Sequence, residues 1–196
     1  MTLAIAPTRR FVLLDRDGTL NVECDYLSDP DQLVLYPGVG KALRQLSGLG
    51  FGLVVLTNQS GVARGYFDLA TVSRVHDRLR DMLKAEGVFL DGIYLCPHGP
   101  DDGCGCRKPL SGMVDQAVAE HGFDPGQAFM VGDKAVDVDL GQAVGATSIL
   151  VRTGWGSKAE REGKCAPATI VDDLAAAAVW IERTIGMDRT GTFRTS

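Results

Sequence analysis

Short apolar runs alternate along this chain with segments in which hydrophobic residues recur at helical spacing. The apolar runs are rich in Val, Ile, Leu and Phe, which is typical of parallel strands that helices cover on both faces. We predict strands at Phe11–Leu14, Gly52–Leu56, Gly92–Leu95, Ala128–Val131, Ser148–Val151 and Thr169–Val171.

The amphipathic segments between these runs predict helices. Their expected bounds are Val39–Leu49, Leu69–Glu86, Gly112–His121, Val136–Val144 and Asp172–Ile185. Asp68 and Ser111 are expected N-caps because short polar side chains accept hydrogen bonds from backbone N–H groups there, and Gly122 is an expected C-terminal stop. The polar stretch Gly154–Pro167 is expected to be a surface loop, and Met187–Ser196 a frayed tail.

This alternation predicts an α/β fold with three layers, a doubly wound and mostly parallel sheet between two layers of helices. We expect one domain over residues 1–186, a C-terminal tail over residues 187–196 and no large cap domain. Ligands bind at the carboxyl ends of the strands in such sheets. The chemically suggestive residues that follow expected strands are Asp15, Thr57, Asn58, Cys96 and Asp133. Their placement predicts a functional site at one edge of the sheet.

Composition and charge narrow the classes of partner. The chain has 196 residues, 45% of them hydrophobic and 23% charged, which suits one folded domain. A formal net charge of -5 argues against nucleic acid as a partner. No run approaches the roughly 20 apolar residues that cross a bilayer, and residues 1–10 lack the apolar centre of a secretory signal. We therefore expect a cytoplasmic protein with no membrane partner, and we expect a monomer because a domain of this size without a cap can work alone.

The segment Asp15-Arg16-Asp17-Gly18-Thr19 places two carboxylates at the end of the first strand. Gly18 lets the chain turn sharply behind them, so that both can point into one crevice. The segment taken alone is equally consistent with an Asp-Gly turn that simply ends a strand.

Two later segments supply matching chemistry. Asp133 follows the fourth strand, and Asp137 lies one helical turn later on the same side. With Asp15 they form an oxygen-rich site of the kind that Mg²⁺ prefers. The segment Thr57-Asn58-Gln59-Ser60-Gly61 offers hydroxyl, amide and backbone donors for a phosphate, although a polar loop has the same composition.

Three cysteines and a histidine lie close together in the segment from Cys96 to Cys106. Cys96, His98, Cys104 and Cys106 make a Cys₃His set suited to a structural zinc ion, and they enclose a loop of Gly, Pro and Asp with little hydrophobic support. A disulfide from Cys96 to Cys104 or Cys106 is the alternative, and it leaves His98 and the remaining cysteine unexplained.

Together these segments resemble the haloacid dehalogenase-like (HAD-like) phosphatases, a family with a Rossmann-like sheet. Its motifs are DxDGT, a Thr or Ser after the second strand, a Lys and GDxxxD, and all four occur in order over residues 10–150. The resemblance implies that Asp15 is the nucleophile and Asp17 the general acid and base. It also implies that Asp15, the backbone carbonyl of Asp17 and Asp133 hold Mg²⁺.

The zinc loop and the residues after it resemble one subgroup of that family. This subgroup comprises the histidinol-phosphate phosphatases and the D-glycero-D-manno-heptose-1,7-bisphosphate 7-phosphatases, which carry CxH followed by CxCRKP. The resemblance implies that Lys108 binds the transferred phosphoryl group and Arg107 helps to recognise the substrate. Lys134 is expected to line the same crevice, or else to be a solvated lysine at a helix start. The other expected substrate-binding residues are Thr57, Asn58, Gln59, Ser60, Asp25 and Tyr26.

The expected substrate is a small phosphorylated metabolite. The segments from Thr57 to Gly65 and from Asn21 to Tyr26 resemble the heptose branch, so that we expect removal of the C7 phosphate from the heptose bisphosphate, in a pathway that supplies activated heptose for surface polysaccharides. One feature departs from that branch, because only five residues separate His98 from Cys104. A histidinol-phosphate phosphatase is therefore the alternative, and an inactive zinc-stabilised binding module a more distant one. A kinase is disfavoured because the sequence has no Gly-x-x-x-x-Gly-Lys-Ser/Thr loop.

Overall fold

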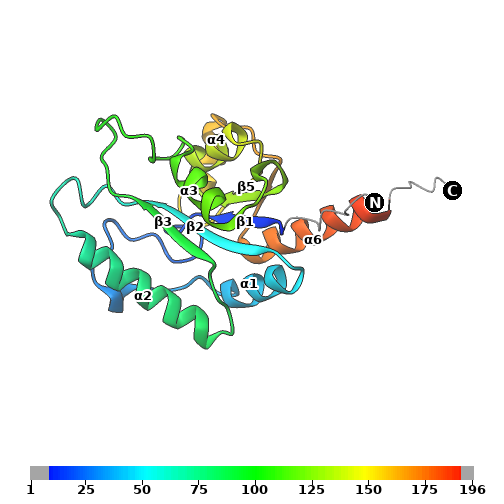
Figure 1. Ribbon diagram of the computed structural model, residues 1–196, viewed down its shortest axis with the longest axis horizontal. Helices are drawn as coiled ribbons and strands as arrows, with labels where there is room; N and C mark the ends of the chain where they lie inside the picture. Colours follow the sequence, from blue (N-terminus) through cyan, green and yellow to red (C-terminus); the bar gives the residue numbers. More distant parts are fainter. Residues whose placement is uncertain (1–8, 191–196) are drawn as a thin grey trace, which may run out of the picture.

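The computed structural model describes the backbone of residues 9–190 and the side chains of residues 9–186. One parallel sheet runs through the middle of the molecule (Figure 1). Its strands are β1 (Phe11–Leu14), β2 (Gly52–Asn58), β3 (Gly92–Cys96), β4 (Phe129–Gly132), β5 (Thr147–Val151) and β6 (Thr169–Val171). They are ordered β3-β2-β1-β4-β5-β6, and every neighbouring pair is parallel. Each expected strand is confirmed, as is the doubly wound fold.

Helices cover the sheet on both faces. Their bounds are α1 (Val39–Gly48), α2 (Leu69–Ala85), α3 (Gly112–His121), α4 (Ala135–Ala143), α5 (Gly156–Glu162) and α6 (Leu174–Thr190), with short 3-10 turns at Pro30–Gln32 and Pro125–Gln127. Figure 1 shows α1 and α2 below the sheet and α3 and α4 above it, while α6 shares the core of α1 and extends to the right. Among residues 9–190, no second folded unit covers the sheet as a large cap domain.

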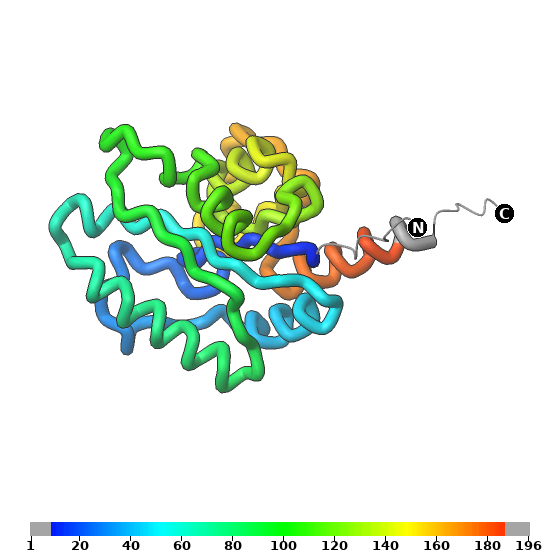
Figure 2. The backbone as a smooth tube through the Cα atoms, viewed as in Figure 1, coloured from blue at the N-terminus to red at the C-terminus, as the bar shows by residue number. Residues whose placement is uncertain are grey.

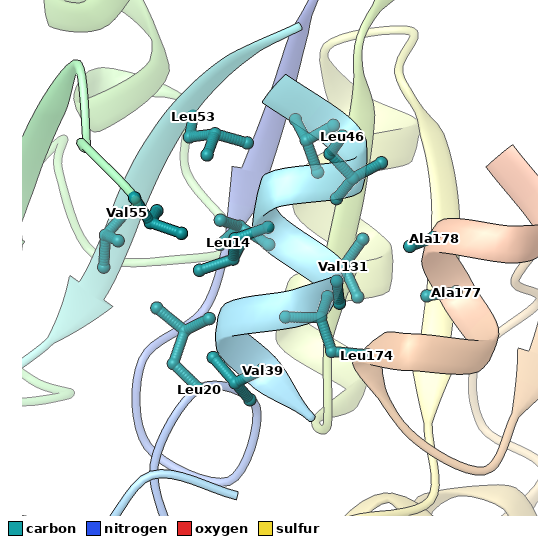
Figure 3. Packing of buried hydrophobic residues seen from close by; sticks show 14 of the residues in the cluster. Leu14, Leu20, Val39, Leu46, Leu53, Val55, Val131, Leu174, Ala177 and Ala178 are labelled. Carbon is teal, nitrogen blue, oxygen red and sulfur yellow. The ribbon is translucent and has the colours of Figure 1, made fainter. Parts of the chain in front are cut away.

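Two hydrophobic cores hold the three layers together because alternate residues of each strand face opposite layers. On one face, Leu14, Val55 and Val131 pack against α1 and α6 (Figure 3). On the other face, Leu13 and Leu56 join a cluster with α3 and α4. The strands are therefore apolar on both sides, as their sequence predicts. None of the described helices is long and apolar enough to cross a membrane.

Two of the three residues expected to cap helices, Asp68 and Gly122, do so in the structure, and Ser111 does not. The side chain of Asp68 accepts a hydrogen bond from the backbone N–H of Thr71 at 2.8 Å, and Gly122 ends α3 with φ +66°. Ser111 stands at the start of α3, but its hydroxyl donates to the Asp115 carboxylate instead of capping the backbone.

Two expectations about the C-terminal part of the chain are wrong. The stretch Gly154–Pro167 is not all loop, because α5 occupies Gly156–Glu162. Its Lys, Ala, Glu and Arg residues favour a helix, Gly163 ends it with φ +61°, and Arg152 holds Glu160 at 2.8 Å. The last helix runs to Thr190 instead of ending at Ile185, since no proline interrupts it. Residues 1–8 and 191–196, parts of the expected signal-free N-terminus and frayed tail, lie outside the described residues.

Candidate active site and zinc loop

The carboxyl ends of β1, β2 and β4 bring three predicted residues to one edge of the sheet. Asp15 directly follows β1, Thr57 lies near the end of β2 and Asp133 follows β4. Parallel pairing aligns these ends, because Leu14 is the register partner of both Val55 and Val131. All three site residues are buried. The predicted edge of the sheet is therefore where these polar side chains meet.

Lys108 enters this edge from the segment between β3 and α3. Its ammonium group lies 2.7 Å from Asp15 Oδ1 and 2.7 Å from Asp137 Oδ1, and it donates to the backbone carbonyl of Leu56 at 2.8 Å. The Lys108 side chain is only 2% exposed. Burial alone lowers the pKa of Lys108, but the charges of Asp137 and Asp15 outweigh it and raise the pKa. Lys108 is therefore a fixed positive charge beside Asp15.

A cluster of carboxylates next to Lys108 has the chemistry of a cation site. Asp15, Asp133 and Asp137 each place a carboxylate oxygen within 4.8 Å of the others. Asp137 Oδ2 accepts from the backbone N–H of Lys134, and Asp137 Oδ1 forms an ion pair with the Lys108 ammonium at 2.7 Å. In Asp133, Oδ2 accepts from the backbone N–H of Trp155, while the buried Oδ1 has no hydrogen-bond partner and lies 3.9 Å from the Lys134 ammonium. Asp133 Oδ1 and Asp15 Oδ2 are therefore the carboxylate oxygens of these two residues that remain open to a cation, since Lys108 engages Asp15 Oδ1.

Electrostatics and packing support the same site. Burial, together with the charge of Asp15, raises the pKa of Asp133 to about 8, so that ionised Asp133 needs a cation nearby. Gly18 and Gly154, both in the left-handed region, press against the Asp133 carboxylate so closely that a Cβ atom on either would collide with it. The backbone at these two glycines therefore packs directly against the Asp133 carboxylate and leaves no space for a side chain there.

Asp17 is held by several donors at once. The Arg16 guanidinium donates to both of its oxygens, with Nη2 2.7 Å from Oδ2, and Asn21 and Gln59 each donate at 2.9 Å. Burial works to raise the pKa of Asp17, but the charge and hydrogen bonds of Arg16, with those of Asn21 and Gln59, lower it overall. Asp17 is thus a carboxylate that can accept a proton and that rests against Arg16.

A crevice of about 240 Å³ opens above Asp17. It brings together Asp25, Tyr26, Asn58, Gln59, Ser60 and Lys134, all expected to bind substrate. Arg107 is not among its lining residues, since it lines a separate pocket and donates to the carbonyl of His98 at 3.1 Å. Thr57 is buried and accepts from Gln59 Nε2 at 2.8 Å.

The second-strand loop also fixes Lys108. The amide group of Asn58 donates to the carbonyl of Lys108 at 3.3 Å and accepts from its backbone N–H at 3.1 Å. These two hydrogen bonds use both the N–H₂ and the oxygen of the Asn58 side-chain amide. Lys134 lines the crevice as expected, but its ammonium lies 2.7 Å from Glu23.

The predicted zinc ligands converge in the long segment between β3 and α3, drawn in green in Figure 2. Cys96 Sγ lies 3.7 Å from Cys104 Sγ and 3.1 Å from Cys106 Sγ, and His98 Nδ1 lies 3.2 Å from Cys106 Sγ. Sulfurs bound to one tetrahedral zinc ion at about 2.3 Å lie about 3.8 Å apart, so this cluster suits zinc. All five cysteines of the chain are free thiols, which sets aside the disulfide alternative.

Three residues at the candidate site, Arg16, Glu23 and Trp155, were not among those expected from the sequence. Arg16 had a signal, since it stands between the two motif aspartates, and Glu23 had one in its place after the motif. Trp155 follows β5, whose carboxyl end lies at the same edge of the sheet as β1 and β4. Trp155 stands four residues beyond the end of β5, at the start of α5, so the strand end points to its loop and not to Trp155 itself.

Removal of one zinc ligand tests the metal centre. We expect elemental analysis of protein purified without chelators to find one zinc ion per chain. Cys106→Ser should lose the zinc and at least about 3 kcal/mol of unfolding free energy, because the loop has few apolar contacts of its own. Cys165→Ser, which alters a cysteine outside the cluster, should keep both. Wild-type protein without zinc, or Cys106→Ser with a full complement, would contradict the assignment.

Comparisons with known proteins agree with this geometry. A family model described as HAD-hydrolase-like matches residues 105–177. A D-glycero-beta-D-manno-heptose-1,7-bisphosphate 7-phosphatase from Pseudomonas putida is 43% identical over 173 residues, which cover 86% of this chain and 97% of that protein. A D-glycero-D-manno-heptose-1,7-bisphosphate 7-phosphatase from Thermosynechococcus vestitus is 40% identical over 187 residues, 88% of this chain and 95% of that protein.

A solved structure extends the likeness to three dimensions. The D,D-heptose 1,7-bisphosphate phosphatase from B. bronchiseptica, complexed with magnesium and phosphate, superposes with a TM-score of 0.83 at 38% identity. The match covers 89% of this chain and 99% of that one. The chain therefore belongs to the HAD-like hydrolases, and within them to the heptose-1,7-bisphosphate 7-phosphatase family.

Proposed function

We propose that this protein is a magnesium-dependent phosphatase that removes the C7 phosphate of D-glycero-D-manno-heptose-1,7-bisphosphate through an aspartyl-phosphate on Asp15. The observation that carries the proposal is the position of Asp15, which is held at 2.7 Å by Lys108 beside the carboxylate of Asp133. A carboxylate nucleophile, a fixed cation and a cation site in one place are what phosphoryl transfer requires.

In the first step, Asp15 attacks the phosphorus and the P–O bond to the sugar breaks. Lys108 neutralises charge on the phosphoryl oxygens as they move. The departing sugar oxygen takes a proton from Asp17. Because Arg16 holds Asp17 as a carboxylate, Asp17 must exchange its contact with Arg16 for the substrate in order to carry that proton. Arg16 therefore sets how readily the acid form is reached.

In the second step, water attacks the phosphorus of the aspartyl-phosphate and gives its proton to Asp17. The bond between phosphorus and Asp15 breaks, which releases inorganic phosphate and restores the Asp15 carboxylate. The lowered pKa of Asp17 keeps this residue in the carboxylate form, which is the form that accepts a proton in this step. Gln59 and Asn21 orient Asp17 for this step through their hydrogen bonds.

Asp15, Asp133 and the backbone carbonyl of Asp17 are the groups that we assign to magnesium. The bound ion supplies positive charge that offsets the repulsion between the anionic nucleophile and the anionic phosphate. Support comes from the open oxygen of Asp133 and from the relative solved with magnesium and phosphate. We assign zinc to the Cys₃His cluster, where it shapes the loop that carries Arg107 and Lys108.

The relatives support a heptose bisphosphate over histidinol phosphate. The relatives described above act, by their names, on the heptose bisphosphate and align over most of the chain. We assign sugar contacts to Asp25, Tyr26, Asn58 and Ser60, which line the crevice, and substrate recognition also to Arg107. We propose that the protein acts as a single domain and as a monomer. We also propose that it works in the cytoplasm, where thiols such as its five free cysteines stay reduced.

A substrate panel tests the function. We expect kcat/KM in Mg²⁺ to be highest for one anomer of the heptose-1,7-bisphosphate, and lower for the other anomer, histidinol phosphate and fructose-1,6-bisphosphate. Asp15→Asn should lose at least about 10³-fold in kcat, because the amide is not a nucleophile. Full turnover by Asp15→Asn would rule out the nucleophile, and a preference for histidinol phosphate would rule out the substrate.

Substitution of each of the two lysines near the site tests which of them binds the transferred phosphate. Lys108→Ala should lower kcat by about 10²- to 10³-fold, because it removes the cation beside the nucleophile. Lys134→Ala should lower kcat/KM by no more than about 10-fold, since Lys134 is paired with Glu23. Thermal unfolding monitors whether each variant is folded. Equal losses in the two folded variants would show that Lys108 is not the phosphate-binding lysine.

A further inference from the structure

The crevice lacks a free positive charge for a second phosphate. Its acidic lining residues are Asp17, Glu23 and Asp25, and its one lining cation is Lys134, whose ammonium lies 2.7 Å from Glu23. A bisphosphate brings a second phosphate that Asp15 does not attack. That group needs a cation that is not already paired.

Arg64 supplies such a cation beside the crevice. Its guanidinium carbon lies 6.0 Å from the centroid of the Tyr26 ring, and Tyr26 lines the crevice. Arg64 is exposed, and no hydrogen bond or ion pair engages its guanidinium among the described residues. A guanidinium over a ring at this distance keeps its N–H groups free for a planar, two-pronged contact with phosphate.

Rings and backbone contacts fix where Arg64 stands. The Tyr26 ring meets the Tyr66 ring edge to face at 4.7 Å, and Tyr26 has φ +56°, an uncommon conformation for a residue other than glycine. The backbone N–H of Arg64 donates to Ser60 at 3.1 Å, and that of Ala63 donates to Pro97 at 3.1 Å. Backbone hydrogen bonds thus connect the loop of residues 60–66 to the segment Thr57–Gly61 and to the zinc loop.

Two other cations near the site are less available. The Lys158 ammonium lies 5.1 Å from the centroid of the Trp155 ring, and Trp155 also lines the crevice. Like Arg64, Lys158 is therefore a cation placed over an aromatic residue of the crevice. It differs because Glu162 lies 3.9 Å from its ammonium. Arg107 donates to the carbonyl of His98 and lines the separate pocket at the zinc loop.

We propose that Arg64, stacked on Tyr26 and backed by Tyr66, binds the phosphate of the substrate that Asp15 does not attack. The inference rests on the proposed function, since it takes a sugar bisphosphate as the substrate. The ligand class is a phosphate monoester dianion at the far end of the sugar. Arg64 is a specificity residue here, because it distinguishes a bisphosphate from a monophosphate and does not touch the reacting atoms.

The test compares the heptose-1,7-bisphosphate with heptose-7-phosphate, which lacks the second phosphate. Arg64→Ala should lower kcat/KM for the bisphosphate by about 10- to 100-fold, mainly through KM, and leave the monophosphate within about 3-fold. Arg64→Lys should recover part of the loss, since it keeps the charge but not the fork. Lys158→Ala is the matched control, and it should leave both substrates unchanged.

Several results would overturn the proposal. Equal losses of Arg64→Ala on both substrates would mean a structural role, and no loss on either would mean no contact. An equal effect of Lys158→Ala would mean that general positive potential acts, with no dedicated subsite. These outcomes leave the proposed function standing, because wild-type protein still hydrolyses the C7 phosphate. If wild-type protein hydrolyses neither substrate, the proposed function and this inference both fail.

Discussion

The contact of Lys108 with Asp15 and Asp137 is the interaction on which the site depends. The ammonium lies 2.7 Å from each carboxylate, and the Lys108 side chain is 2% exposed. A buried charge that loses its partner costs several kcal/mol, so the three groups hold one another in place. Because they come from β1, the zinc loop and α4, this one cluster joins three elements that the sequence keeps far apart.

The zinc loop acts on the site through its place in the chain. Cys106 is followed directly by Arg107 and Lys108, so an ion that fixes Cys106 also limits where Lys108 can stand. Asn58 adds a second constraint through its two hydrogen bonds to the backbone of Lys108. A loop with few apolar contacts can thus deliver a lysine to a buried position, since a metal and an amide group replace the packing that it lacks.

The strands, the edge of the sheet and the positions of Asp15 and Asp133 could be anticipated, because strand periodicity can be read from the sequence and parallel strands bring their carboxyl ends to one edge. The helix α5 was not anticipated, because this short segment has no apolar residues at helical spacing, even though its Lys, Ala, Glu and Arg residues favour a helix. Lys108 was assigned by family resemblance, and its bond to Asp137 depends on how loop and helix meet. The hydrogen bonds from Arg16 to Asp17 and the contact of Arg64 with the Tyr26 ring also depend on the folded chain, and no residue spacing in the sequence predicts them.

The stereochemical course at phosphorus tests the covalent mechanism most directly. A substrate whose transferred thiophosphate is made chiral with oxygen isotopes reports whether the phosphorus is displaced once or twice. Attack by Asp15 followed by attack of water is two in-line displacements, so the account predicts net retention of configuration. Net inversion would mean that water attacks the substrate directly, and it would contradict the role of Asp15 as a nucleophile.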